Sequence, residues 1–322
     1  MIYLNEKNIN EIGVKWNDII TTIEEATKCL ANKDFTQPIK PYLRYRDLKN
    51  RIIAMPAFVG GDINKSGIKW IASFPDNIKN NIPRAHSVVI LNNADTGIPE
   101  AVINTPKLSI LRTAGVTGSI IKAFNKARVL KNVNVGIIGW GPIGQHHFKM
   151  VTDLLGDKID NIFLYDLNPI DADSIDSKYK EKVQVVQCWQ DAYKDADIFM
   201  TCTVSKEPYI DMEPKKGSLQ LNVSLRDYKT DIYDYVKGNI IVDDWEEVCR
   251  ETTDIEMLHL QKGLNKEDTK SIVDLLCNNC INEYSQDDVI MFNPMGMAVY
   301  DIALGNYFAN NAIRLGIGYE LK

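Results

Sequence analysis

The first hundred residues combine one helical pattern with several strand patterns. Residues 16–32 repeat apolar side chains at intervals of three and four, which predicts an amphipathic helix. Apolar, β-rich runs separated by glycine, proline and asparagine then predict a mixed or antiparallel sheet, with strands in residues 51–60, 66–74, 86–93 and 98–104. A second helix is expected from Ser109 to Phe124, leading into the next part of the chain.

From Val133 onward the pattern changes to one typical of a parallel sheet. Six apolar runs are spaced by segments long enough for crossover helices or loops, at residues 133–139, 161–166, 183–189, 196–204, 218–225 and 239–245. This pattern predicts a doubly wound α/β domain of the Rossmann type, whose ligands bind at the carboxyl ends of the strands. A last helix is expected after Pro294 and should return to the first domain.

Composition narrows the class of partner. The 322 residues are 45% hydrophobic and 25% charged, as is ordinary for a globular protein of two domains. Lysine and arginine number 37 against 43 acidic residues, and the net charge of -6 argues against nucleic acid or acidic membranes and favours small-molecule partners. No apolar run approaches the roughly 20 residues of a membrane helix. The first residues lack the layout of a signal peptide, so a cytoplasmic protein is expected.

The six cysteines predict neither disulfides nor a metal site. They are scattered, and Cys188 and Cys202 lie in apolar, strand-like runs where they are interpreted as small core residues. The one close pair, Cys277 and Cys280, has no second pair or neighbouring histidines to complete a zinc site. Reduced thiols are therefore expected.

The most specific motif directly follows the first strand of the parallel sheet. Gly139 permits a tight turn, Gly141 lets a pyrophosphate approach the backbone, and Gly144 lets the next helix pack close to the strand. The free N–H groups of that helix N-terminus suit a phosphate. The alternative is a plain strand-to-helix turn. We favour dinucleotide binding, by a loop that comprises Gly139, Gly141, Pro142, Ile143 and Gly144.

An acidic residue ends the next strand. Asp166 lies at the distance along the chain at which a carboxylate binds the adenosine ribose hydroxyls. Its charge would repel a 2′-phosphate, and residues 167–169 offer no lysine or arginine, so NAD is favoured over NADP. Three residues at the end of the fourth strand should line the same crevice, unless they merely end the strand: Thr201, Cys202 and Thr203.

Several cations lie in apolar surroundings outside this domain. Lys69 lies within a predicted strand and Arg112 on a predicted helix, and such side chains are seldom buried unless paired. Each could instead be a surface side chain whose stem packs on apolar groups. Together they suggest a clamp for carboxylates, to which the same domain could add Lys40, Arg44 and Arg84.

These motifs occur together in one known family. In order, and over nearly the whole chain, the segments GIKW, SILRTAG, GIIGWGPIG, DIFMTCTV, LQLNVSLRD and PMGMAVYD resemble the ornithine cyclodeaminase/mu-crystallin family. Other segments, among them QPIKPYLR, PRAHSVVILN and NPMGMA, more closely resemble one branch of it. That branch oxidises N-(2-amino-2-carboxyethyl)-L-glutamate in the siderophore-linked synthesis of 2,3-diaminopropionate.

The resemblance implies a domain organisation and a homodimer. A Rossmann domain (residues 113–292) would be inserted into a mixed α+β substrate and dimerisation domain (residues 1–112, with a return segment 293–322). It also places Gly296 and Asp301 in a family segment near the nicotinamide, although the start of a helix explains these two residues equally well.

The resemblance also implies roles for individual residues. Arg44, Lys69 and Arg112 match the family's substrate-carboxylate residues, and Arg112 and Thr113 lie near the cofactor phosphates. Asp227 falls at the position of the catalytic acid, and Lys69 is the second candidate catalytic residue. Without the resemblance, Asp227 would be interpreted as a solvated aspartate in a turn.

Two departures from the family pattern bear on the substrate. Ile53 replaces an acidic residue of the cyclodeaminases, and Arg84 replaces a threonine. Losing an acid and gaining a base suits an anionic substrate, and a conjugate with three carboxylates would match Arg44, Lys69, Arg84 and Arg112. The implied reaction is oxidation by NAD followed by hydrolysis to L-2,3-diaminopropionate and 2-oxoglutarate. Ornithine cyclodeamination, reduction of a cyclic imine, and a non-catalytic dinucleotide-binding or hormone-binding role remain as alternatives.

Overall fold

The computed structural model describes residues 1–321 and divides the chain into two compact units. The first unit comprises Met1–Val116 and Gly296–Lys322, and the second comprises Thr117–Met295. The long helix α3 (Lys107–Arg128) begins in the first unit and ends in the second, so the sequence prediction of Ser109 to Phe124 was correct but short.

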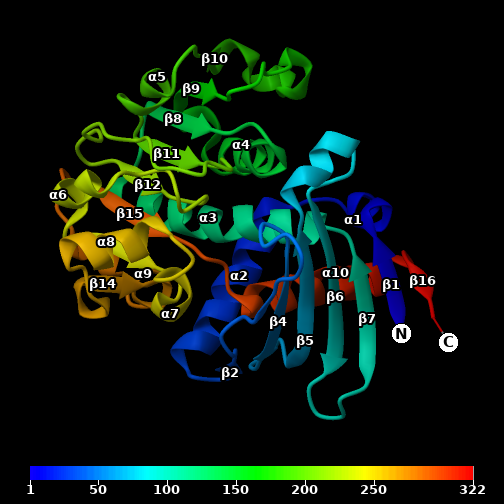
Figure 1. Cartoon of the computed structure of the whole chain (residues 1–322). Coiled ribbons are helices and arrows are strands. Elements are labelled where there is room, and N and C mark those ends of the chain that lie inside the picture. The colour runs from blue at the N-terminus through cyan, green and yellow to red at the C-terminus, as the bar shows by residue number, and fades with distance from the viewer. Residues whose placement is uncertain (322) are drawn as a thin grey trace. The chain divides into compact units, whose positions relative to one another are not determined.

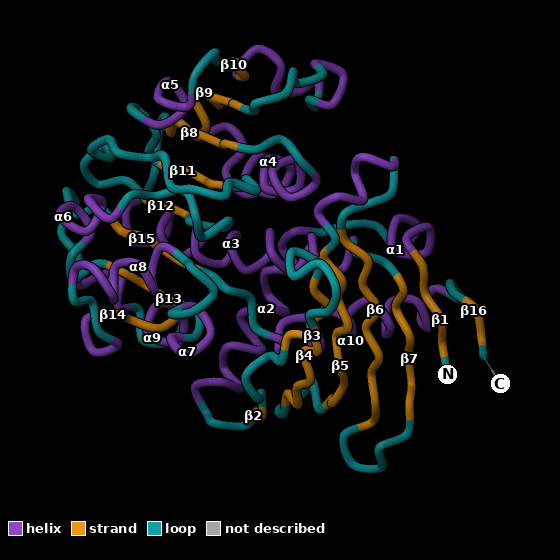
Figure 2. The backbone as a smooth tube through the Cα atoms, in the orientation of Figure 1, coloured by secondary structure: helices purple, strands orange, loops and turns teal. Residues whose placement is uncertain are grey.

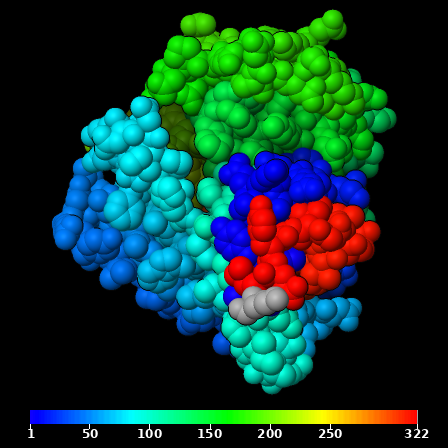
Figure 3. All heavy atoms as spheres, turned by 90° about the vertical axis from the view of Figure 1, so that its right-hand side faces the viewer, coloured from blue at the N-terminus to red at the C-terminus, as the bar shows by residue number. Residues whose placement is uncertain are grey.

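The first unit is built on one mixed sheet. Its strand order is β16-β1-β7-β6-β5-β4-β2, with β3 also paired to β4, and every neighbouring pair except β1 with β7 is antiparallel. The strands are β1 (Ile2–Asn5), β2 (Phe35–Thr36), β3 (Tyr42–Leu43), β4 (Arg51–Val59), β5 (Lys65–Ser73), β6 (Ala85–Asn93), β7 (Pro99–Asn104) and β16 (Tyr319–Glu320). The first and last strands meet here, since β1 pairs with β16 and the two segments lie side by side in Figure 3.

Helices cover one face of this sheet. The helix α10 (Ala298–Leu315) packs on β4, β5 and β6 and against α2 (Trp16–Ala31), and the short helix α1 (Glu6–Ile12) contacts α10 (Figure 1). Strand register then decides which side chains are buried, because successive residues point to opposite faces. Met55, Lys69 and Val89 are directly opposite one another and are all buried, which puts Lys69 in the core of the unit.

The second unit contains an eight-stranded, all-parallel sheet, with helices between most of its strands (Figure 2). Its order is β10-β9-β8-β11-β12-β15-β13-β14. The strands are β8 (Val133–Ile138), β9 (Ile159–Tyr165), β10 (Val183–Val185), β11 (Ile198–Thr201), β12 (Leu219–Leu221), β13 (Ile240–Val242), β14 (Thr269–Ser271) and β15 (Ile290–Asn293). This doubly wound sheet confirms the predicted fold class.

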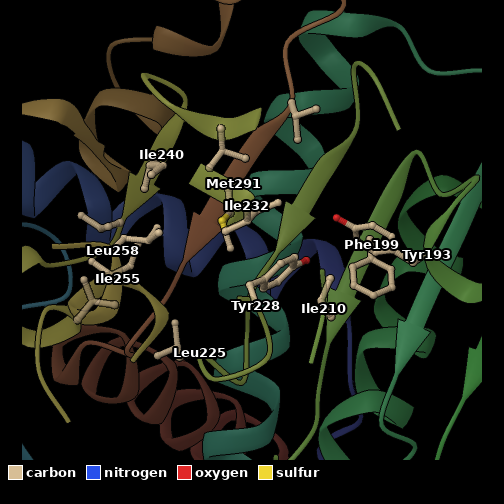
Figure 4. Packing of buried hydrophobic residues seen from close by; sticks show 14 of the residues in the cluster. Tyr193, Phe199, Ile210, Leu225, Tyr228, Ile232, Ile240, Ile255, Leu258 and Met291 are labelled. Carbon is tan, nitrogen blue, oxygen red and sulfur yellow. The ribbon is translucent and has the colours of Figure 1, made fainter. Parts of the chain in front are cut away.

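Short helices connect most of these strands. The α-helices of the unit are α4 (Pro142–Leu155), α5 (Trp189–Tyr193), α6 (Tyr233–Val236), α7 (Trp245–Val248), α8 (Asp254–Lys262) and α9 (Ile272–Leu276). Short 3-10 helices occur in both units, at Pro75–Asn80, Gly156–Lys158, Ala172–Ser174, Ser177–Lys182, Thr230–Ile232, Lys266–Asp268 and Cys280–Glu283. Buried aromatic and aliphatic side chains from strands, helices and loops form one cluster in this unit (Figure 4).

The strand predictions for this sheet needed three corrections. Six strands were expected, but β14 and β15 also belong to the sheet, and β15 enters between β12 and β13 out of sequence order. The run 183–189 forms a strand only to Val185. Cys188 is the N-cap of α5 and Cys202 follows the end of β11, so both are half-buried loop residues and not strand residues in the core.

Candidate functional site

The glycine-rich loop joins β8 to α4 in the way the motif predicts. Gly139 has a φ of 92°, and a Cβ there would lie 2.4 Å from the carbonyl oxygen of Cys202. A Cβ on Gly144 would lie 1.9 Å from the carbonyl oxygen of Gly139, so both positions require glycine. A Cβ on Gly141 would meet no atom within 4 Å. Gly141 is also the N-cap of α4, so open space adjoins the helix N-terminus where a phosphate can bind.

The carboxylate of Asp166 is held next to this loop. Oδ2 accepts a hydrogen bond of 2.6 Å from the backbone N–H of Trp140. Oδ1 accepts from the backbone and side-chain amides of Asn168, at 2.8 and 3.2 Å. The indole of Trp140 packs edge-on against Phe148 and donates to Ser174, which fixes the loop from its other side. The structure therefore brings together the glycine loop, with Pro142 and Ile143 starting α4, and the acidic strand end.

The three residues predicted at the end of the fourth strand lie beside the glycine loop. The backbone N–H of Cys202 donates to the carbonyl of Ile138 at 2.7 Å. The Thr201 hydroxyl donates to the side chain of Asn222 at 3.2 Å, and the Thr203 hydroxyl donates to Asp227. These bonds connect the end of β11 both to the loop after β8 and to the turn that carries Asp227.

Asp227 is fully buried, so its interpretation as a solvated turn residue is wrong. The hydroxyls of Thr203 and Ser224 donate to its two carboxylate oxygens. Its own carbonyl accepts from the backbone N–H groups of Tyr209 and Ile210, each at 2.8 Å. Both the side chain and the backbone of Asp227 are thus fixed at the carboxyl-end side of the sheet.

A second buried acid in this unit was missed by the sequence analysis. Oδ2 of Asp254, at the start of α8, accepts from the backbone N–H groups of Asp227 and Tyr228 and from the Asn222 side chain, at 3.1, 3.2 and 3.0 Å. Burial, opposed by these bonds, raises the pKa of Asp254 to about 7. In the sequence, Thr253-Asp254 has only the pattern of an ordinary helix start, which gives no signal of this role.

In the first unit, two of the predicted cations share one buried carboxylate. Lys69 Nζ lies 2.7 Å from Oδ2 of Asp301, and Arg112 Nε lies 3.0 Å from Oδ1. Lys69 is 2% exposed, Arg112 6% and Asp301 0%, so the alternative of surface side chains is wrong for both cations. Lys69 also lies 3.3 Å from the Ser109 hydroxyl. Asp301 is in the first turn of α10, and its role as the shared partner was not predicted.

The charges in this cluster shift the ionisation of their neighbours. Burial lowers the pKa of Lys69 to about 7. The negative charge of Asp301 acts to raise this pKa, and the positive charge of Arg112 acts to lower it further. Burial acts to raise the pKa of Asp301, but Arg112 and Lys69 outweigh it and hold that pKa below its ordinary value. Asp301 therefore stays ionised, and the Lys69 ammonium is sensitive to any further anion that comes close.

A third cation completes the cluster. Lys40 is 3% exposed, and its Nζ donates to the carbonyl of Gly296 at 2.8 Å. Gly296 has a φ of 89°, and a Cβ there would lie 2.6 Å from Nη1 of Arg112, so this glycine allows the guanidinium to lie against the backbone. We call Lys40, Lys69, Arg112 and Asp301 the basic cluster. Two of its cations, Lys69 and Arg112, share the single carboxylate of Asp301, which leaves an excess of positive charge there.

The other predicted cations lie differently. Arg44 is exposed and, like Arg51, its guanidinium lies over the ring of Tyr42, at 5.3 Å from the centroid. Arg84 is half-buried just before β6. The Thr113 hydroxyl donates to the carbonyl of Ser109 within α3 at 2.8 Å. The structure thus groups Lys40, which the sequence suggested only as an addition, with Lys69 and Arg112.

Among residues 1–321, no group of three or more His, Cys, Asp or Glu side chains is arranged to hold a metal ion. None of the helices in that range is long and apolar enough to span a membrane.

The architecture defines the class: a Rossmann-type α/β unit, with a glycine-rich loop and an acidic strand end, inserted into a mixed-sheet unit with a buried basic cluster. The chain belongs to the ornithine cyclodeaminase/mu-crystallin family, whose model matches residues 4–314.

Relatives with assigned names resemble the chain over its whole length. It is 33% identical to N-((2S)-2-amino-2-carboxyethyl)-L-glutamate dehydrogenase of Staphylococcus aureus, over 100% of this chain and 98% of that protein. It is 24% identical to alanine dehydrogenase of Archaeoglobus fulgidus, over 100% and 98%. Among solved structures, Thermococcus litoralis Δ1-pyrroline-2-carboxylate reductase in complex with NADH and L-proline has a TM-score of 0.88 at 20% identity, covering 100% of both chains. The last likeness shows the fold.

Proposed function

We propose that this protein is an NAD-dependent dehydrogenase that oxidises N-(2-amino-2-carboxyethyl)-L-glutamate. With water, the products are L-2,3-diaminopropionate, 2-oxoglutarate, NADH and a proton. The observation that carries the proposal is the buried pairing of Lys69 and Arg112 with the one carboxylate of Asp301, because two cations on one acid leave positive charge that suits a substrate with several carboxylates. The 33% identity to a dehydrogenase named for this conjugate supports the choice of substrate. The product would be available for siderophore synthesis.

Support for NAD comes from the second unit. The space beside Gly141 admits a pyrophosphate to the N-terminus of α4, and Asp166 presents a carboxylate at the end of β9 for the ribose hydroxyls. Leu167, the residue after Asp166, is 89% exposed, so its apolar side chain is accessible to a bound cofactor. When bound, NAD supplies the hydride acceptor for the reaction.

The residues of the chain have separate tasks in this reaction. The basic cluster binds the substrate carboxylates and orients the C–H bond that is broken, with Lys69 as the catalytic lysine next to the reacting carbon. Arg44 and Arg84 contribute to a distal carboxylate. Loss of hydride from the carbon bearing the secondary amine leaves an imine, and water adds to that carbon before the C–N bond breaks. Asp227 orients this water and accepts its proton.

We also propose that the protein is a homodimer. The uncovered face of the first sheet is apolar and continuous across four strands, because the strand register aligns its side chains: Ile52, Ala54, Pro56, Phe58, Ile68, Trp70, Val88, Ile90 and Val102. These side chains are half-buried, apart from Trp70, which is 42% exposed. A second copy of the chain would cover this face.

The test is to incubate the protein with NAD and, separately, the conjugate, L-ornithine or L-proline, and to follow the absorbance of NADH. Net NADH with the conjugate, together with 2-oxoglutarate, is the expected result. Proline from ornithine without net NADH would instead identify a cyclodeaminase. Oxidation of L-proline with NAD would identify a reductase running in reverse, and binding of NAD without any turnover would identify a non-catalytic protein.

A single substitution tests the substrate charge. Arg84→Thr should raise the KM for the conjugate on the order of tenfold, because a charged hydrogen-bond donor is lost from a carboxylate. The affinity for NAD is expected to stay as in the wild type. An unchanged KM would remove Arg84 from the substrate site and weaken the case for a tricarboxylate.

A further inference from the structure

Two strained backbone segments lie against each other around Asp227. One segment, residues 222–228, follows β12, and the other, residues 251–254, leads into α8. Leu225, Glu251 and Thr252 have φ values of 65°, 65° and 55°, in the left-handed region that non-glycine residues rarely adopt. Such conformations persist only where the surrounding contacts enforce them, and they concentrate at functional sites.

Hydrogen bonds join the two segments directly, and we call the pair the clasp. Between the segments, the backbone N–H of Asp254 donates to the carbonyl of Leu225 at 2.8 Å. Within the first segment, the backbone N–H of Leu225 donates to the side chain of Asn222 at 3.1 Å. The guanidinium of Arg226 donates to the carbonyl of Glu251 at 2.7 Å. Each strained segment is therefore held by the other.

Apolar packing holds the same two segments together. Leu225 is 4% exposed and belongs to a buried cluster with Ile255 and Leu258 of α8, and with Tyr228 from its own segment (Figure 4). A left-handed backbone conformation is unfavourable for leucine, but the side chain of Leu225 is packed in this buried cluster. The clasp is thus built into the core of the unit and is not a flexible surface turn.

Asp254 is the centre of the clasp. One carboxylate oxygen accepts three hydrogen bonds, from the backbone of Asp227 and Tyr228 and from Asn222, and all three donors are neutral N–H groups. A buried carboxylate without a cationic partner is costly to fold, so stability alone gives no reason for an acid here. Helix capping gives none either, because the Thr253 side chain already accepts from Glu256 as the N-cap of α8.

We propose that Asp254 is a positioning residue that fixes the backbone of Asp227, so that the Asp227 carboxylate stays between the hydroxyls of Thr203 and Ser224. The inference rests on the proposed catalytic role of Asp227. Through its bond to Asn222, Asp254 also joins the turn to the strand ends, since Asn222 donates to Asn293 at 2.8 Å and accepts from Thr201. Asp254 itself does not touch substrate in this proposal.

The test compares Asp254→Ala and Asp254→Asn, each alone and combined with Asp227→Asn. Asp254→Ala should lower kcat on the order of 100-fold, because a small displacement of a catalytic group is enough for such a loss. The dissociation constant for NAD should not change. Asp254→Asn keeps an oxygen acceptor and should recover most of the loss. In the Asp227→Asn background, Asp254→Ala should cause no further loss of kcat.

The matched control is Asp274→Ala in the same unit. Asp274 also accepts a backbone N–H, from Ser271 at 2.8 Å, in the capping box of α9. It should cost stability without changing kcat. Hydrogen exchange measured by mass spectrometry should accelerate in residues 222–228 for Asp254→Ala and not for Asp274→Ala.

Several outcomes would overturn the inference. They are a normal kcat in Asp254→Ala, an equal loss in both backgrounds, or unchanged exchange in residues 222–228. If Asp254→Ala does not fold, a kcat in Asp254→Asn as low as that of Asp227→Asn would overturn it as well, whereas recovery supports it. A fully active Asp227→Asn would instead refute the proposed role of Asp227, and this result is separate from the behaviour of Asp254.

Discussion

At the scale of single residues, burial shifts the pKa values of two titratable groups in opposite directions. His147 is fully buried in α4, where Nδ1 donates to the carbonyl of Ile143 and Nε2 accepts from the Thr117 hydroxyl. Burial lowers the pKa of His147 to about 4, from an ordinary value of 6.5. Burial raises the pKa of Asp254 to about 7, from 3.8. Both groups are therefore neutral in the folded protein over a range in which they are charged in the unfolded chain.

The two shifts have opposite effects on stability in the same pH range. Between about pH 4 and 6.5 the unfolded chain binds a proton at His147 that the folded protein does not, so stability is lost as the pH falls, by about 3 kcal/mol in total. Between about pH 4 and 7 the folded protein retains a proton at Asp254 that the unfolded chain releases, so stability is lost as the pH rises.

Urea unfolding of His147→Gln, Asp254→Asn and wild type at several pH values separates the two effects. Relative to wild type, His147→Gln should gain stability toward pH 4, whereas Asp254→Asn should gain it toward pH 7. If the free energy of unfolding varied with pH in the same way for the wild type and both variants, neither group would have a shifted pKa.

At the scale of elements, the strand–loop–helix unit was predicted in detail because its signal is local. Gly144 lies within a few residues of the backbone oxygen of Gly139 that excludes a side chain there, and the run Val133–Ile138 carries its own strand pattern. The oxygen that excludes a side chain at Gly139 belongs to Cys202, which is distant in sequence, but the glycine motif still marks the turn. β15 was missed because it is short and pairs with strands distant in sequence. β14 was missed because its residues, Thr269–Ser271, are polar and lie at the edge of the sheet.

The glycines of this loop offer a matched pair of substitutions. Gly144→Ala should destabilise the protein, because its Cβ would lie 1.9 Å from the carbonyl oxygen of Gly139. Gly141→Ala should fold normally, since its φ of -71° suits alanine and its Cβ meets no atom within 4 Å. It should nevertheless weaken NAD binding, because the methyl group would occupy the space for the pyrophosphate.

Thermal unfolding and NADH fluorescence titration measure the two effects separately. Equal NADH affinity in Gly141→Ala and wild type would show that the pyrophosphate does not approach this position. A Gly144→Ala protein with the wild-type Tm would contradict the contact with Gly139.

At the scale of the whole molecule, the contacts that sequence patterns could not give are those between distant residues. Asp301 is separated from Arg112 by 189 positions, so its pairing with two cations leaves no periodic signal. The pattern did indicate that Lys69 and Arg112 were unusual, because cations in apolar runs need partners. The clasp could not be predicted either, because a leucine in the sequence gives no sign that its φ is positive, as it is at Leu225.

The apolar face of the first sheet predicts how the chain assembles. Ile90 lies opposite Ile68 and Val102 near the middle of that face, so Ile90→Glu would place a charge at the centre of the proposed interface. Light scattering after size exclusion should give a dimer for the wild type and a monomer for Ile90→Glu. Leu260→Glu is the matched control, because Leu260 is 67% exposed on α8 and is not part of that face. A wild-type monomer, or a dimeric Ile90→Glu, would show that this face does not bind a second copy.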